Sequence, residues 1–415
     1  MHSVQAAFSG FLRNTLVNAA GIAGGQLIVL LAMPVLARKY SPAEFGVYAS
    51  LVAVSSVTAT AACMRFDVAL PATTDGETPA LYRLGVLACL ISLCIGVLAV
   101  WLGLYRLSFW PQVLSNASLA LLAVVVGTLQ GLLFVFTGTL VRQGSFLHTA
   151  MLRIIQPASF IAVALMAVPL GLPVAFAIGV VTAVALGLLF SRRYLLAPAR
   201  YGLRQAVQRY WEYPVISLPT AVLDTVALSL PLLFIVQHYG AAAGGNYSQV
   251  QRLAAAPLLL CAVAISQVFY KHAGDVVRSG HSARPLLWKT VKALSTVGAG
   301  LIAIAILMGE PLLTAFLGTA WRTDTIYLLL ILLPAVIRTC VAPITTVFLI
   351  TKQVRLCAAW QVTYAAVTFA VLSYASTHLP LEGLLICAMA GDFAMYAIYL
   401  WLADLAIRRF DAKEF

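Results

Sequence analysis

Four ionisable residues stand inside long apolar runs, where a charge is costly: Asp224, Arg252, Arg338 and Asp392. A charge well inside a bilayer costs at least ~2.5–3.5 kcal/mol, so it normally faces a partner ion or a watery cavity. Arginines fixed in such a cavity would bind an anion, because guanidinium stays protonated and pairs well with phosphate oxygens. The aspartates would pair with those arginines or take up a proton or cation. This pattern indicates a membrane protein with a polar interior, which is typical of transport.

Two more charges, Arg65 and Asp67, close the second apolar run at its end. Arg65 would meet an anion at the membrane surface, or it would snorkel to headgroups with Asp67 as its partner. The first half of the chain shows no ion at mid-depth. Its polar candidates there are Asn18, Gln26 and Gln130, which would hydrogen-bond a ligand or join neighbouring helices.

The composition is that of a polytopic membrane protein. Of its 415 residues, 62% are hydrophobic and only 10% are charged, and the mean hydropathy is +0.96. Soluble domains carry nearer ~25% charged residues, which excludes a large soluble α-helical protein. The net charge of +12 is interpreted as cytoplasmic loop charge, because no basic patch with interleaved aromatics lies outside the apolar zones. Nucleic acid is therefore not an expected partner.

Length and hydropathy predict about twelve membrane-spanning helices. They are expected near residues 15–37, 44–64, 82–104, 117–140, 149–169, 172–190, 214–236, 247–269, 288–308, 325–350, 356–376 and 382–405. Several contain an internal proline, which membrane helices tolerate as a kink.

Lysine and arginine predict the orientation. With both termini in the cytoplasm, about 20 basic residues fall on the inner side and about 4 on the outer side, which is a strong positive-inside signal. Arg153 is counted among the inner charges. The N-terminus lacks a charged region ahead of its apolar residues, so the first span is expected to act as an uncleaved signal.

The expected division is an N-lobe at 1–190 with spans one to six, a linker at 191–212, and a C-lobe at 213–415 with spans seven to twelve. The linker is basic and aromatic, and it lies on anionic headgroups as an amphipathic segment or is simply solvated. A weak repeat connects the halves: Pro34 with Gly46-Val47-Tyr48 recurs as Pro231 with Gly245-Asn246-Tyr247. Parallel repeats of this kind are typical of transporters, although chance similarity of apolar sequence is an alternative.

Several motifs give the chain a family resemblance. The first half holds a glutamine in its first span, an Ala-Arg turn that runs to a glycine, and an Arg-Phe-Asp at the end of its second span. These are Gln26, Ala37 to Gly46, and Arg65-Phe66-Asp67. The second half adds Tyr213-Pro214, Leu230-Pro231, Gly245-Asn246-Tyr247 and Pro257 with Gln267-Val268-Phe269. Together they resemble the polysaccharide-unit (O-antigen and exopolysaccharide) flippases of the multidrug/oligosaccharidyl-lipid/polysaccharide exporter superfamily.

The resemblance implies two six-helix lobes around a central cavity that opens alternately to each side. It implies transfer of undecaprenyl-pyrophosphate-linked oligosaccharides from the inner to the outer leaflet of a bacterial inner membrane. The expected partners are this lipid-linked substrate, membrane lipids, and polysaccharide polymerase or export proteins. No cofactor is expected, although coupling to H⁺ or Na⁺ is a hypothesis.

The candidate site follows from this implied substrate. Arg338, near mid-membrane, Arg252, nearer the outer side, and Arg65, at the inner face, are expected to meet the pyrophosphate. Asp224, Asp392 and Asp67 are interpreted as coupling groups or as charge partners of these arginines. Among the polar candidates of the first lobe, Asn18, Gln26 and Gln130 would hydrogen-bond sugar hydroxyls.

Two other classes of function remain as alternatives. A cation-coupled exporter of drugs or small molecules would have the same fold, but it would favour carboxylates and aromatics over arginines in its cavity. A polytopic membrane polysaccharide enzyme would need a clustered acid/base pair or a sizeable outer loop. The histidines are scattered, and no nucleophile, phosphate-loop or metal motif is present. The sequence therefore predicts a protein that is not an enzyme and holds no metal.

Overall fold

The structure of the protein is a computed structural model. It describes residues 2–106, 111–198, 202–254, 284–321, 323–341 and 353–414, with a few single residues between these ranges. In this part of the chain every regular element is helical, and ten helices are long and apolar enough to cross a membrane. Thr325–Val341 adds a shorter apolar helix. The predicted all-α membrane fold is confirmed, while the predicted span at 247–269 lies largely outside the described residues.

The chain forms two compact units, as the two-lobe prediction required. The first comprises Met1–Ser229 and the second Leu230–Phe415, so their boundary falls inside α10 (Leu218–Tyr239). Contacts of the linker and of the first half of α10 explain this position. Tyr210 donates a hydrogen bond to Glu77, and the hydroxyls of Thr225 and Thr60 lie 3.4 Å apart. The predicted division at 190 and 212 stays a prediction.

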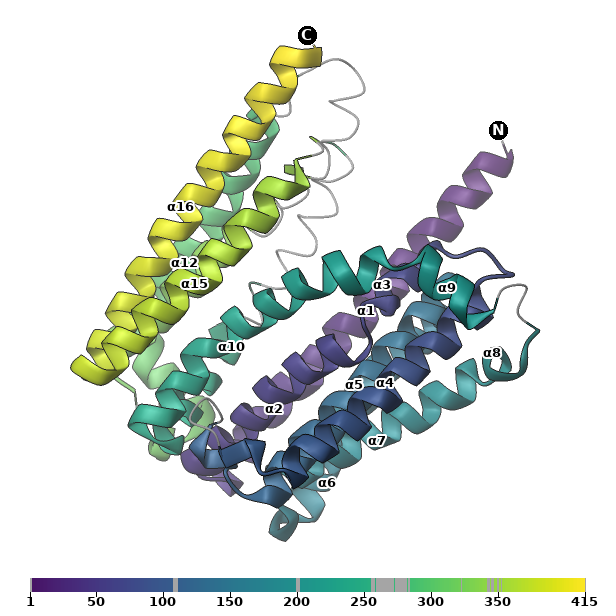
Figure 1. Ribbon diagram of the computed structural model, residues 1–415. Coiled ribbons are helices and arrows are strands. Elements are labelled where there is room, and N and C mark those ends of the chain that lie inside the picture. Colours follow the sequence, from purple (N-terminus) through teal and green to yellow (C-terminus); the bar gives the residue numbers. More distant parts are fainter. Residues whose placement is uncertain are drawn as a thin grey trace. The chain divides into compact units, whose positions relative to one another are not determined.

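Long helices build the N-terminal unit around α5. Its elements are α1 (His2–Lys39), α2 (Pro42–Ala62), α3 (Phe66–Ala69), η1 (Leu70–Ala72), α4 (Thr78–Trp101), α5 (Ala117–Arg142), α6 (Phe146–Met166), α7 (Gly171–Ser191), α8 (Arg193–Leu196) and α9 (Leu203–Arg209). Helix α5 packs against α2, α4 and α7, and α6 packs against α1 and α7 (Figure 1). Short 3₁₀ turns and a π-helical turn at Tyr213–Ser217 complete the unit.

The chain reverses sharply where α2 ends. Helix α2 begins with a capping box, in which the side chains of Ser41 and Glu44 each satisfy a backbone N–H of the other residue. It stops at Met64 and Arg65, whose φ angles of 50° and 61° lie in the left-handed region. Two consecutive non-glycine residues there are unusual, and they turn the chain into α3. This turn directs Asp67 toward α5.

Two glycines allow backbones to approach closely beside this turn. A Cβ on Gly138 of α5 would lie 2.5 Å from the carbonyl oxygen of Asp67, and one on Gly25 of α1 would lie 2.5 Å from that of Arg153. Pro157 follows Arg153 by one helical turn and has no N–H, so the Arg153 carbonyl lacks its helical hydrogen bond. The two glycines thus fix α3 on α5 and α1 on α6.

The C-terminal unit contains α12 (Arg284–Leu317), α13 (Thr325–Val341), α15 (Val354–His378) and α16 (Leu381–Glu414), and residues 241–254 are also helical. Helix α13 packs against both α12 and α16. Helix α15 packs along α16 (Figure 1). Asp404 on α16 accepts hydrogen bonds from Arg284 and Trp288 of α12. These bonds join the two longest helices of the unit.

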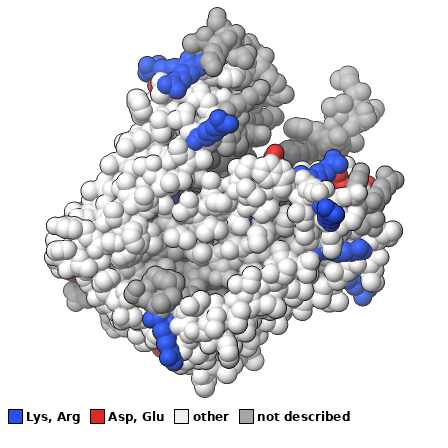
Figure 2. Space-filling view, in the orientation of Figure 1, with Lys and Arg blue, Asp and Glu red and all other residues white. Residues whose placement is uncertain are grey.

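The surface separates charged from uncharged residues. On the face drawn in Figure 2, the sides of the helices are almost entirely uncharged, and lysine and arginine stand at the margins. Large apolar side chains such as Leu31, Trp101 and Leu307 are also exposed. Such surfaces fit a hydrocarbon environment and not water.

Candidate functional site

A pocket of about 460 Å³ lies inside the N-terminal unit, between α3, η1, α5 and α6. Its polar wall is formed by Asp67, Gln130, Thr137, Arg153 and Gln156. Gln130 and Thr137 share one face of α5, and Arg153 and Gln156 share one face of α6, because residues three, four or seven positions apart align on a helix. Two of the sequence candidates, Asp67 and Gln130, therefore meet in one pocket.

Arg153 is the cation of this pocket. It lies two turns inside α6, and its Nη1 donates a hydrogen bond of 2.7 Å to Asn18 Oδ1 on α1. No carboxylate oxygen of the described residues lies within 4.0 Å of its nitrogens. The sequence candidate Asn18 is thus a neutral partner of a charged group. Sequence reasoning counted Arg153 with the inner loop charges, and its i, i+3 spacing from Gln156 was the available signal.

Asp67 brings a carboxylate to the same pocket. Its Oδ1 accepts a hydrogen bond from Cys63 Sγ at 3.3 Å, and its Oδ2 lies 3.9 Å from Arg65 Nη1. The pairing of Arg65 with Asp67 that the sequence suggested is therefore present, although it is long. Arg65 itself is not a lining residue of the pocket, and its Nε is buried without a hydrogen-bond partner in the described structure.

Of the two remaining amide candidates, one lines the pocket and the other does not. Gln130 lines the pocket, and no hydrogen bond involves its side chain within the described part of the chain. Gln156, which the sequence analysis did not single out, is in the same condition. Gln26 is exposed on α1 and does not line the pocket. Its predicted role in binding sugar hydroxyls stays a prediction.

In the C-terminal unit, Arg338 lies in a cluster of hydroxyl groups. Its Nε donates to Tyr396 Oη and its Nη2 donates to Tyr364 Oη, each at 3.2 Å. Asp392 Oδ2 lies 3.6 Å from Nη2, and Tyr364 donates to Asp392 Oδ1 at 2.9 Å. The Arg338 side chain is 29% exposed and that of Asp392 is 12% exposed. This is the ion pair that the sequence analysis set beside a ligand-binding role for Arg338.

Aromatic rings hold this cluster in place. Trp360 stacks on Tyr364 with ring centroids 5.1 Å apart, and its indole N–H donates to the Met395 carbonyl. Sequence reasoning missed both tyrosines. Their spacing was the signal, because Tyr364 follows Trp360 by four residues and Tyr396 follows Asp392 by four residues on α16.

Arg252 and Asp224 lie elsewhere. Arg252 is half-buried in the helical residues 241–254, and Asp224 is half-buried on α10, in the part assigned to the N-terminal unit. Each has interaction partners in the structure. Their roles in substrate binding and coupling stay predictions.

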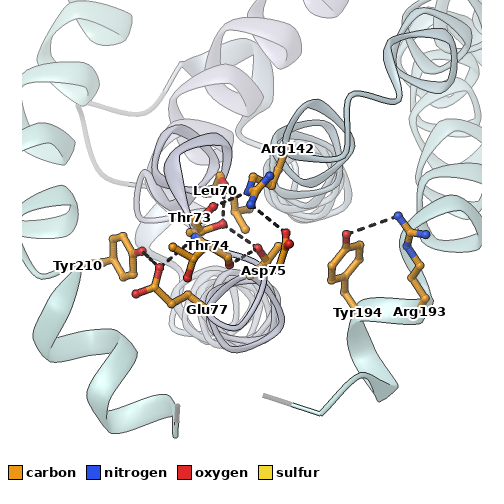
Figure 3. Close-up of polar contacts among 10 residues, drawn as sticks. Leu70, Thr73, Thr74, Asp75, Glu77, Arg142, Arg193, Tyr194 and Tyr210 are labelled. Atoms are coloured by element: carbon orange, nitrogen blue, oxygen red, sulfur yellow. Dashed lines mark hydrogen bonds and ion pairs between the residues drawn. The ribbon is translucent and has the colours of Figure 1, made fainter. Parts of the chain in front are cut away.

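A group of polar contacts joins the linker to the loop that precedes α4 (Figure 3). Glu77, with a side chain 5% exposed, accepts a hydrogen bond from the Thr74 N–H and another from Tyr210, and it pairs with Arg209 at 2.9 Å. The Thr74 N–H and these partners hold the pKa of Glu77 below its usual range. The linker helix α9 is therefore tied to the loop before α4.

The same loop is held from α5 (Figure 3). Arg142, at the end of α5, donates to the Thr73 carbonyl and pairs with Asp75 at 2.9 Å. This ion pair is exposed at Asp75, so it contributes little to stability. The loop at 73–77 thus connects α5 with α9, while the interaction of the linker with lipid headgroups stays a prediction.

The fold and the two buried polar sites define a polytopic α-helical membrane protein with the architecture of the MATE transporters. Two solved structures of a multidrug resistance MATE family transporter of the MOP superfamily are similar. The outward-facing one has a TM-score of 0.56 and 14% identity and covers 97% of this chain and 96% of its own. The inward-facing one has a TM-score of 0.58 and 14% identity and covers 95% of each chain. A mutant MATE transporter of Vibrio cholerae has a TM-score of 0.57 and 13% identity and covers 98% of each chain.

The sequence matches the model of the polysaccharide biosynthesis protein family over residues 35–325. This match spans more than half of the chain, and the protein belongs to that family. No curated protein sequence matches the chain.

Proposed function

We propose that the protein is a flippase for lipid-linked oligosaccharide units. It would carry an undecaprenyl-pyrophosphate-linked oligosaccharide from the inner to the outer leaflet of a bacterial inner membrane. The lipid tail stays in the bilayer while the polar head crosses the membrane, and no covalent bond is made or broken. Membership in the polysaccharide biosynthesis family and the MATE fold support this proposal. Alternating access would follow from movement of one unit against the other.

The observation that carries the proposal is the setting of Arg338. Its guanidinium lies among membrane-spanning helices, and two of its hydrogen bonds go to neutral tyrosine hydroxyls. The one carboxylate, Asp392, lies at 3.6 Å and also accepts a bond from Tyr364. A pyrophosphate that crosses a bilayer needs a fixed positive group, since exposure of its charge to hydrocarbon is prohibitive. Arginine supplies that charge, because it stays protonated even when it is partly buried.

The test is a flipping assay in proteoliposomes with a fluorescent undecaprenyl-pyrophosphate oligosaccharide. We expect Arg338→Gln to stop flipping and Arg338→Lys to restore part of it, because lysine keeps the charge but not the planar fork. Arg142→Gln, which removes a half-buried arginine of the loop junction, is the matched control and should transport normally. Normal flipping by correctly folded Arg338→Gln would contradict the proposal. Export of a cationic dye with no flipping of the lipid would favour the drug-exporter alternative.

Coupling to H⁺ or Na⁺ is part of the proposal and concerns Asp224. A carboxyl inside a membrane helix can take up a proton or a cation during the cycle. Asp224→Asn should therefore abolish flipping driven by an ion gradient while the protein remains folded and at normal abundance. Normal transport by this variant would exclude a coupling role for Asp224, and degradation of the variant would indicate a structural role instead.

A further inference from the structure

The pocket of the N-terminal unit contains a set of polar groups that the proposed function does not use. We propose that it is a glycosyl-binding subsite, which holds a sugar residue of the lipid-linked oligosaccharide. This inference rests on the proposed function. It adds a place for the sugar, one that is separate from the place for the charge.

The hydrogen-bonding groups of the pocket are of mixed type. Asp67 can only accept when ionised, Arg153 can only donate, and the amides of Gln130 and Gln156 can do both. Among the described residues no protein group forms a hydrogen bond with the side-chain amide of either glutamine. Arg153 donates one hydrogen bond to Asn18. A sugar hydroxyl is both a donor and an acceptor, so it needs partners of both kinds side by side. This wall provides them from α3, α5 and α6.

Phe134 supplies an apolar surface in the same pocket. It follows Gln130 by four residues on α5, lines the pocket, and is 43% exposed. A pyranose ring presents an apolar C–H face as well as hydroxyls, and an aromatic ring can cover that face while polar neighbours bind the rim. The volume of about 460 Å³ lies in the range of sites that enclose a small ligand.

The charges of the pocket favour a neutral ligand over a phosphate. Asp67 and Arg153 contribute opposite charges to one wall. The second cation nearby, Arg65, pairs with Asp67 and does not line the pocket. A phosphate group would meet the carboxylate of Asp67 as well as the guanidinium of Arg153. A sugar would bond to both without repulsion. The sugar and the pyrophosphate are therefore assigned to different cations of the protein.

The first experiment compares two kinds of lipid on the purified full-length protein. The probes are bare undecaprenyl pyrophosphate and undecaprenyl pyrophosphates that carry one N-acetylglucosamine, glucose or galactose. We expect at least one glycosylated lipid to bind more tightly than the bare lipid. Phe134→Ala and Gln156→Ala should each weaken binding of the glycosylated lipid about tenfold and so remove its advantage. They should leave binding of the bare lipid unchanged. Leu121→Ala, at an exposed position of the same helix outside the pocket, is the control.

Arg338→Gln separates the two sites, because it should weaken binding of the bare and the glycosylated lipids by the same factor. If no glycosylated lipid binds more tightly than the bare lipid, the glycosyl subsite is wrong. It is equally wrong if the pocket variants weaken both lipids alike or change neither. If the wild-type protein binds neither kind of lipid, the proposed function fails, and the second experiment decides the pocket by itself.

The second experiment uses free sugars and the variant Thr137→Cys, which places a thiol of nearly the same size on the pocket wall. Its alkylation by a maleimide is read at this peptide by mass spectrometry. We expect the methyl glycoside of at least one of the same three sugars to slow labelling. Inorganic phosphate added to the same buffer should leave the labelling rate unchanged. Labelling that no sugar slows, or that phosphate slows equally, overturns the proposal, as does a thiol that never reacts.

Discussion

The two arginine sites of the protein are built in opposite ways. Arg338 is surrounded by tyrosines and one aspartate, and rings such as Trp360 pack against its partners. Arg153 has one neutral hydrogen-bond partner and faces a pocket whose two glutamines are unused among the described residues. The same residue type thus stands in a packed cluster in one unit and in an open pocket wall in the other. Substitutions of the partners of Arg338 should therefore reduce stability as well as pyrophosphate binding, whereas substitutions in the pocket should reduce ligand binding alone.

Loss of Asp392 should have the largest effect on stability. Asp392→Ala leaves Arg338 without its carboxylate, and removal of one member of a buried ion pair costs about 3–5 kcal/mol. Because Arg338 is 29% exposed, we expect the lower end of that range. The measurement is the free energy of unfolding in detergent micelles. An equal loss of stability in Arg153→Gln would contradict the distinction between the two arginine sites.

Tyr364→Phe should have the next largest effect. The hydroxyl donates to Asp392 and accepts from Arg338, so its removal leaves two groups short of a partner at a site that is otherwise packed. Hydrogen bonds to charged groups contribute about 1.5–3 kcal/mol, and we expect a loss near 2 kcal/mol. Gln156→Ala in the pocket is the matched case and should cost less than about 0.5 kcal/mol. Equal losses in thermal unfolding would contradict the distinction between the two sites.

Gly138→Ala tests the wall of the pocket. The added Cβ would lie 2.5 Å from the Asp67 carbonyl oxygen, so α3 must shift away from α5. Overpacking of this kind costs about 1–3 kcal/mol, and the shift should also weaken binding at the pocket. Gly300→Ala on α12 is the control, because its Cβ would meet nothing within 4 Å. There the loss of glycine flexibility should stabilise the helix by about 0.5–1 kcal/mol. A stabilised Gly138→Ala would contradict this geometry.

The smallest expected effect is local and depends on pH. The pKa of Glu77 is lowered in the folded protein, so this carboxylate stabilises the linker contact above its unfolded pKa of about 4.3. The contribution is lost as the pH falls through the lower, folded pKa. We expect the hydrogen-exchange protection of α9, corrected for the intrinsic pH dependence of exchange, to fall in that window, and Glu77→Gln to lower it at neutral pH by weakening the Arg209 pair. A corrected protection that does not change with pH would exclude this role for Glu77.

The sequence predicted the helices well because length and hydropathy are what a membrane span requires. The expected span 117–140 corresponds to Ala117–Arg142, and 356–376 corresponds to Arg355–His378. The helix that corresponds to the expected span 382–405 is longer than expected, since α16 continues to Glu414. The apolar run ends near Asp404, but Asp404 pairs with Arg284 and Arg408 and the helix continues past it.

The sites were predictable only in part. Charges in apolar runs pointed to Arg338 and Asp392, and the structure pairs them. The tyrosines that bond to them were missed, since tyrosine is ordinary in a membrane helix and their spacing from Trp360 and Asp392 was not used. The pocket required three segments that are far apart in the chain to converge, and a single sequence does not report such contacts. Arg153 was missed because a basic residue near a helix start is ordinarily a topology charge, and its i, i+3 spacing from Gln156 was not used.

The left-handed turn at Met64 and Arg65 stores conformational energy at the edge of the pocket. Each residue in that region costs about 1–3 kcal/mol relative to a helical conformation. If both relaxed, α2 would lengthen toward α3 and carry the Asp67 carboxylate out of the pocket wall. The resting protein thus holds the carboxylate in place against a force that favours its withdrawal. Relaxation of this turn would therefore remove one acceptor from the pocket wall and leave its other polar groups in place.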